Sequence, residues 1–219
     1  MIGKGPAMAK KKKLTPWVQG IDISKNQTID WAKLDKSVKF VIIKATDGAT
    51  YVDPSFVANW AAAGGRATLK RGAYHFFRPD ADVDRQLALI TQTVDLRPGD
   101  LPIAVDVENT TARRLTPADA PALAALLTRL RADSGRPPIV YTNKSSWGDL
   151  GNPASAGDFA FRECPLWIAH YTIKPSPDYP HPWVQWLMWQ HAETGRVAGV
   201  SYPVDVDRFN GTAQGLKRL

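Results

Sequence analysis

Short apolar runs with the character of strands recur along the whole chain, and over most of its length helical patterns separate them. The run at residues 40–45, Phe-Val-Ile-Ile-Lys-Ala, is too short and too rich in β-branched residues for a buried helix. Strands that alternate with helices form parallel sheets, and eight of them suffice to close a barrel. The candidate strands are residues 18–23, 40–45, 71–77, 101–108, 139–142, 166–171, 183–190 and 203–206.

Two helices are marked by their first residues. Asp53-Pro54 and Thr116-Pro117 each place a capping side chain before a proline, and glycines at Gly64 and Gly135 are typical of helix ends. We also expect a brief helical turn over residues 29–35. Beyond the fifth strand, irregular proline-rich loops replace the helices. The predicted fold class is therefore α/β, an irregular TIM-like (β/α) barrel with eight strands and fewer helices in its C-terminal half.

Length and charge define the domain organisation. A chain of 219 residues with 44% hydrophobic residues can bury one core, because single α/β barrels commonly have about 200–250 residues. Residues 1–16 hold the run Lys10 to Lys13 and are predicted to be a basic flexible arm before a catalytic domain at residues 17–219. The formal charge of +7 favours polyanionic partners.

Two carboxylates lie at i and i+2 in the fourth apolar run. Side chains of alternate strand residues point the same way, so Asp106 and Glu108 share one face, about 6.5–7 Å apart along the backbone. That spacing suits acid and base chemistry. The alternative is an ordinary strand end, in which one acid caps a turn and the other pairs with Arg113 or Arg114.

Further polar residues follow the other predicted strands. Reactive residues of parallel barrels lie where the strands end, so Asp22 and Asp205 are expected to join Asp106 and Glu108 at one mouth. Four neighbouring carboxylates raise one another's pKa, which keeps a carboxylic acid protonated for use as a general acid. Tryptophans near the strand ends could form a floor for sugar rings, although each one alone is more typical of a core.

Short sequence blocks follow one another in a fixed order along the chain. They are Gly20-Ile21-Asp22-Ile23-Ser24, Asp30-Trp31, Phe40-Val41-Ile42-Ile43-Lys44-Ala45-Thr46, Gly72-Ala73-Tyr74-His75-Phe76, Asp106-Val107-Glu108, Trp167-Ile168-Ala169, Trp189-Gln190 and Val204-Asp205. With these blocks the chain resembles the glycoside hydrolase family 25 lysozymes, the Chalaropsis-type N-acetylmuramidases, over about residues 17 to 212. The resemblance implies an irregular barrel that cleaves the β-1,4 bond between N-acetylmuramic acid and N-acetylglucosamine in peptidoglycan.

The same resemblance implies residue roles. Glu108 would be the general acid, and Asp106 would assist at the sugar carbon, either as nucleophile or by orienting the N-acetyl group of the substrate. Asp22 and Asp205 would tune this pair and bind substrate. The residues expected to contact substrate are Tyr74, His75, Tyr141, Trp167, Tyr171, Trp189 and Gln190.

Three positions depart from the family pattern. Asp47 stands where the family usually has glutamate, His170 where it tends to have glutamine, and His191 where it tends to have an aromatic residue. The spacing of His75, His170 and His191 resembles no zinc site, so neither a metal nor another cofactor is expected.

The leading hypothesis is a phage endolysin that acts as a muramidase on peptidoglycan glycan strands. No apolar stretch of signal-peptide length accompanies the first residues, so we expect accumulation in the host cytoplasm and action at the cell wall or periplasm after release. Export by a secretion machine would leave the same pattern. Lys10 to Lys13 could contact anionic envelope polymers or lipopolysaccharide, and a monomer is the default expectation.

Two other function classes are weighed against this hypothesis. The first is a catalytically silent glycan-binding module on the same barrel, but its decay would usually remove clustered acids such as Asp22 and Asp205. The second is a nucleic-acid-binding protein, which requires basic residues interleaved with exposed aromatics. No such motif is present, and no specific nucleic acid partner is expected.

Overall fold

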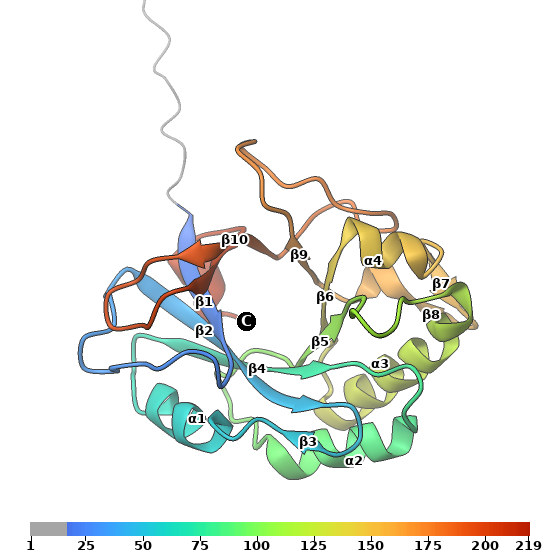
Figure 1. Cartoon of the computed structure of the whole chain (residues 1–219), viewed down its shortest axis with the longest axis horizontal. Coiled ribbons are helices and arrows are strands. Elements are labelled where there is room, and N and C mark those ends of the chain that lie inside the picture. Colours follow the sequence, from blue (N-terminus) through green and yellow to red (C-terminus); the bar gives the residue numbers. More distant parts are fainter. Residues whose placement is uncertain (1–16) are drawn as a thin grey trace, which may run out of the picture.

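In the computed structural model, which describes residues 17–219, eight strands close into a barrel (Figure 1). The predicted basic arm with Lys10 to Lys13 lies outside the described residues. Around the barrel, each strand pairs with the next, and the last pairs with the first. In that order they are β1 (Val18–Ile23), β2 (Val38–Asp47), β4 (Lys70–Phe76), β5 (Ala104–Val107), β6 (Ile139–Asn143), β9 (Leu166–Ala169), β10 (Met188–Gly195) and β11 (Val204–Phe209).

One strand runs against the others. Neighbours from β1 to β10 pair in parallel, whereas β11 is antiparallel to both β10 and β1. Asp205 therefore lies near the beginning of its strand, and its predicted place at the end of a parallel eighth strand is wrong. Because the strand is reversed, Asp205 still reaches the mouth, where it is the backbone partner of Asp22. The predicted eight-stranded irregular barrel is confirmed.

The longer helices lie in the first two thirds of the chain, as predicted. They are α1 (Phe56–Gly64), α2 (Val83–Thr93) and α3 (Ala120–Ser134), and they pack outside the barrel (Figure 1). The predicted end of α3 is confirmed, since Gly135 follows it in the left-handed conformation with a φ of 67°. Residues 29–35 form only turns and a bridge. In the described part of the chain, no helix is long and apolar enough to cross a bilayer.

Short elements complete the described fold. After β6, short elements replace the regular helices, and β7 and β8 among them form a small hairpin. The short elements of the described fold are β3 (Tyr51–Val52), η1 (Pro117–Asp119), α4 (Lys144–Asp149), β7 (Ser155–Ala156), β8 (Phe159–Ala160), η2 (Phe161–Glu163) and α5 (Ala213–Lys217).

The core has two layers separated by the barrel wall. On β5, Val105 and Val107 belong to the large cluster that includes the residues of α3, whereas Ala104 belongs to a smaller cluster with Phe40 and Trp167. Strand side chains alternate in direction, so the face of Ala104 also carries Asp106. The apolar residues of the smaller cluster thus form the floor beneath the polar mouth.

Close packing of this floor leads to a stability prediction for Gly20. A Cβ atom added there would lie 2.2 Å from the ring of Phe40, far inside contact distance. Gly20→Ala should therefore lower the free energy of unfolding by about 1–3 kcal/mol, as overpacked cores do. Urea denaturation would measure this change, and the loss should be smaller in a Phe40→Leu background. An unchanged urea midpoint in the single variant would contradict this packing.

Candidate active site

Four carboxylates meet at the mouth of the barrel. Asp22 lies on β1, Asp106 on β5, Glu108 directly after β5 and Asp205 on β11. Asp22 and Asp106 are buried, with 5% and 7% of their surfaces exposed, and Glu108 and Asp205 are half-buried. Glu108 and Asp205 both line a cavity of about 570 Å³. A group bound in this cavity would therefore be in reach of these two acids.

The pair Asp106 and Glu108 has the electrostatics of an acid with a carboxylate partner. Burial raises the pKa of both groups, and the charge of Glu108 raises the pKa of Asp106 further. Lys44 and Arg78 counteract part of this effect on Asp106, and the hydrogen bond from Asn143 counteracts part of it on Glu108. Because two neighbouring buried carboxylates oppose each other's ionisation, the pair can retain one proton for use by a general acid.

Asn143 holds the side chain of Glu108 in place. Its amide Nδ2 donates to Glu108 Oε1 at 2.8 Å, while its Oδ1 accepts from the backbone N–H of Ser146 at 2.9 Å and caps α4. The cap fixes the orientation of the amide, so the donor faces Glu108. We did not predict this residue, although an asparagine between a strand and a helix is a cap signal.

The alternative of an ordinary strand end is wrong, because the two arginines pair elsewhere. Arg113 forms a bidentate ion pair with Asp119, at 2.7 and 3.1 Å. Arg114 pairs with Asp149 at 2.6 Å. Asp106 and Glu108 are therefore free of both arginines, and Asp106 Oδ1 is buried without a hydrogen-bond partner.

Gln190 connects three of the residues expected at the site. Its Nε2 donates to Asp22 Oδ2 at 2.8 Å, and its Oε1 accepts from the hydroxyls of Tyr141 and Tyr171, each at 2.8 Å. Gln190, Tyr141 and Tyr171 line the cavity that holds Glu108 and Asp205, whereas Asp22 does not. This network fixes Asp22 and presents two tyrosine rings at the mouth, of which Tyr171 is 49% exposed.

His75 is part of the core. It is 1% exposed, its Nε2 lies 3.0 Å from Gln86 Oε1, and its Nδ1 lies 2.8 Å from the hydroxyl of Thr46. The amide oxygen of Gln86 can only accept, so His75 carries its proton on Nε2. Burial lowers the pKa of His75 to about 4, and the ring is neutral near pH 7. His75 was predicted to contact the substrate, but its buried ring has a structural role instead.

The two tryptophans expected at the site are buried as well. Trp167 and Trp189 are 2% and 0% exposed, so neither offers a face to a sugar ring where the sequence predicted contact. The indole N–H of Trp189 donates to the backbone oxygen of His170 at 2.7 Å. Tyr74 is half-buried and packs edge-on against Trp167, with 6.4 Å between ring centroids. Trp167 and Tyr74 therefore support the mouth from below, whereas Trp189 lies in the large cluster on the other side of the barrel wall.

Asp207 is a buried acid that the sequence analysis missed. It is 0% exposed, its Oδ1 accepts from the indole N–H of Trp167 at 2.8 Å, and its Oδ2 has no partner. Burial, followed by the charge of Asp205, raises its pKa from an ordinary value of 3.8 to about 7. The i, i+2 spacing of Asp205 and Asp207 repeats that of Asp106 and Glu108, and this spacing is the signal that could have revealed it.

The raised pKa of Asp207 predicts how its replacement affects stability. Between pH 4 and pH 7 the unfolded chain releases this proton while the folded chain keeps it, so rising pH favours unfolding in this window. Asp207→Asn removes that effect. Relative to wild type, its free energy of unfolding should rise by roughly 3–4 kcal/mol across the window, since the window covers about three pH units and one pKa unit corresponds to about 1.4 kcal/mol. A difference independent of pH, measured by urea denaturation, would contradict the assignment.

The three departures from the family pattern have defined partners. Asp47 binds Arg78 through both oxygens, at 2.7 and 3.1 Å, and Lys44 at 3.3 Å. His170 Nδ1 accepts from the backbone N–H of Asp178 at 2.9 Å. His191 packs against Trp189 with 5.7 Å between ring centroids. None of these contacts engages the four acids at the mouth.

Comparisons with known proteins agree with this geometry. The family model for glycosyl hydrolases family 25 matches residues 21–200. The chain is 35% identical over 210 residues to the uncharacterized protein YegX of Escherichia coli K12, covering 91% of this chain and 72% of that protein. It is 33% identical over 224 residues to Lysozyme M1 of Streptomyces globisporus, covering 94% and 72% of the two chains.

A solved structure supports the same relationship. The bacterial lysozyme from Streptomyces coelicolor superposes with a TM-score of 0.82 and is 34% identical, covering 94% of this chain and 97% of that one. Family model, relatives and fold thus agree with the resemblance. The chain therefore belongs to glycosyl hydrolases family 25 and is a glycoside hydrolase.

Proposed function

We propose that this protein is an N-acetylmuramidase that hydrolyses the β-1,4 bond between N-acetylmuramic acid and N-acetylglucosamine in peptidoglycan. The observation that carries the proposal is the pair Asp106 and Glu108 at the mouth of the barrel, two neighbouring carboxyl groups whose pKa values burial raises. The similarity of the chain to Lysozyme M1 and to the lysozyme from Streptomyces coelicolor supports peptidoglycan as the substrate.

The proposed chemistry assigns one role to each acid of the pair. Glu108 donates its proton to the glycosidic oxygen as the bond to the anomeric carbon breaks. Asp106, as a carboxylate, assists on the other side of that carbon, as nucleophile or by orienting the N-acetyl oxygen that attacks it. Glu108, now a carboxylate, then takes a proton from the water molecule that completes hydrolysis.

Asp22 and Asp205 are proposed to support this pair rather than to exchange protons with the substrate. Gln190 holds Asp22 at 2.8 Å, and burial raises the pKa of Asp205 to about 6. The charge that Asp205 carries above its pKa stabilises the positive charge that develops on the sugar ring in the transition state. Burial raises the pKa of Asp22 well above its ordinary value, so its carboxyl group is proposed to bind and orient the substrate. Tyr141 and Tyr171 complete the wall of the cavity that receives the glycan.

Release of reducing ends tests the proposal. Purified peptidoglycan should yield new reducing sugars with the wild-type protein, whereas chitin, a polymer of N-acetylglucosamine alone, should yield far fewer. Binding to peptidoglycan without release of reducing ends would instead favour the silent glycan-binding module.

We further propose that the hydrolysis serves cell lysis, as in a phage endolysin. The net charge of +7 supports this role because it favours anionic envelopes. Expression in bacteria together with a separate membrane-pore protein should lyse the cells only when both proteins are made. Lysis that does not depend on the pore protein would contradict this delivery route.

A further inference from the structure

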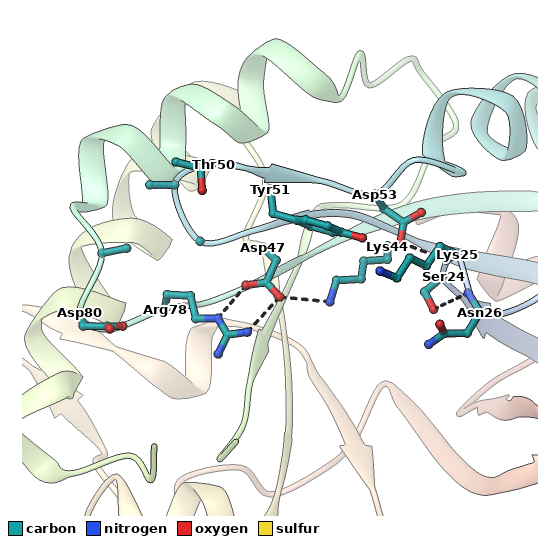
Figure 2. Close-up of a pocket in the computed structure, with 13 residues that line it drawn as sticks. Ser24, Lys25, Asn26, Lys44, Asp47, Thr50, Tyr51, Asp53, Arg78 and Asp80 are labelled. Carbon is teal, nitrogen blue, oxygen red and sulfur yellow. Dashed lines mark hydrogen bonds and ion pairs between the residues drawn. The ribbon is translucent and has the colours of Figure 1, made fainter. Parts of the chain in front are cut away.

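A second cavity, of about 770 Å³, lies where the loops after β1, β2 and β4 meet (Figure 2). Arg78 and Asp80 line this cavity and also a smaller one that reaches Glu108, so the hollows adjoin along the mouth. Lys44 and Arg78 in its wall are the cations that act on Asp106. A substituent of a sugar bound over Asp106 could therefore extend into this cavity, which we call the β2 cavity.

Two carboxylates that line the β2 cavity, Asp47 and Asp53, already accept hydrogen bonds from other residues of the protein. Both oxygens of Asp47 are bound by Arg78, and one also by Lys44 (Figure 2). Asp53 is 1% exposed and accepts from the backbone N–H of Lys25 at 3.0 Å and from Ser55 at 2.6 and 2.9 Å. Neither acid has an oxygen left without a donor.

The cations of the β2 cavity retain free donors. Lys25 is exposed, and among residues 17–219 no carboxylate lies within ion-pair distance of its Nζ, which sits 5.5 Å from the centroid of the Tyr51 ring. Arg78 uses Nε and Nη2 on Asp47 and leaves Nη1 unbound. Asp80 is exposed at the opposite end of the cavity from Lys25 (Figure 2). The donors that remain suit an anion.

We infer that the β2 cavity binds a carboxylate carried by the C3 substituent of the muramic acid residue. This inference rests on the proposed function. Muramic acid bears a lactyl ether at C3, whereas N-acetylglucosamine bears a neutral hydroxyl there. The carboxylate has two sources, the lactyl group of a bare glycan and the stem peptide attached to that group. Lys25 and Arg78 would thus distinguish muramic acid from N-acetylglucosamine at the bond to be cleaved.

Three matched substrates test this inference. They are a bare peptidoglycan tetrasaccharide with free lactyl carboxylates, the same compound with those carboxylates converted to methylamides, and the tetrasaccharide with stem peptides attached. Wild type should have a KM about fivefold lower for at least one of the two carboxylate substrates, the bare glycan or the peptide-bearing one, than for the methylamide, a size typical of partly exposed charge pairs. The difference should shrink at high salt.

Lys25→Gln removes one charge and keeps the backbone contact to Asp53, so the fold is expected to persist. This variant should lose most of the preference for the carboxylate substrate. Lys36→Gln is the matched control, because it makes the same change in the turn before β2, at the end of that strand away from the mouth. It should keep the full preference.

The outcomes separate the two sources and the two proposals. A preference for the peptide-bearing substrate over the methylamide assigns the stem peptide, and a preference for the bare glycan alone assigns the lactyl group. Equal KM values for all three substrates in wild type, or an unchanged preference in Lys25→Gln, would overturn the inference while leaving the muramidase intact. Hydrolysis of none of the three by wild type would overturn the proposed function and this inference with it.

Discussion

Glu108→Gln is expected to lower kcat on peptidoglycan by about 10³-fold, the size of a lost general acid. Glutamine keeps the shape of the side chain, and its amide oxygen can still accept the hydrogen bond from Asn143. It has no acidic proton that it could transfer to the leaving oxygen. The unfolding midpoint and binding to insoluble peptidoglycan should stay close to wild type. Turnover measured by reducing-end release, together with a sedimentation assay, would check both expectations.

The matched control is Glu163→Gln. Glu163 lies in η2 and pairs with Arg131 at the surface, outside the cavities that adjoin the acids at the mouth. This variant should turn over peptidoglycan at nearly the wild-type rate. Near wild-type turnover by Glu108→Gln itself would refute its assignment as the acid.

Asp106→Ala is expected to have a second large effect, a fall in kcat on the order of 10³-fold. The variant loses the carboxylate that assists at the anomeric carbon, and Glu108 loses the charge beside it. Because alanine leaves space, added azide can enter and react. The product that forms then separates the two roles left open for Asp106.

Azide that replaces a nucleophilic Asp106 attacks the anomeric carbon directly, expels the leaving sugar and gives the α-glycosyl azide. If Asp106 instead orients the N-acetyl group, the acetyl oxygen attacks first, and azide then opens that intermediate to the β-glycosyl azide. Nuclear magnetic resonance of the product distinguishes the two anomers. Wild-type activity in Asp106→Ala without azide would contradict both roles.

Much of the barrel could be predicted because local patterns are decisive where both faces of a strand are buried. The run at residues 40–45 lies within β2, and the signals at Thr116-Pro117 and Gly135 mark the beginning of η1 and the end of α3. The direction of β11 could not be predicted in this way. The alternation of apolar and polar residues looks the same in both chain directions. The direction of β11 relative to its neighbours is set only by its antiparallel pairing with β1 and β10.

The site was predictable as a set of acids and less so as a set of contacts. Asp106 and Glu108 follow from an i, i+2 spacing, but the bond between Gln190 and Asp22 joins residues 168 positions apart. No local pattern carries such a contact. Trp167 and Trp189 illustrate a further limit, since an aromatic near a strand end can face the core or the substrate.

The most direct test of the central claim is the identity of the bond that is cleaved. Purified peptidoglycan would be digested with wild type and with Glu108→Gln, the fragments reduced with borohydride, and their ends identified by mass spectrometry. We predict fragments that end in reduced muramic acid with wild type and none with Glu108→Gln. Fragments that end in reduced glucosamine, or equal amounts of product from both proteins, would contradict a muramidase acting through Glu108.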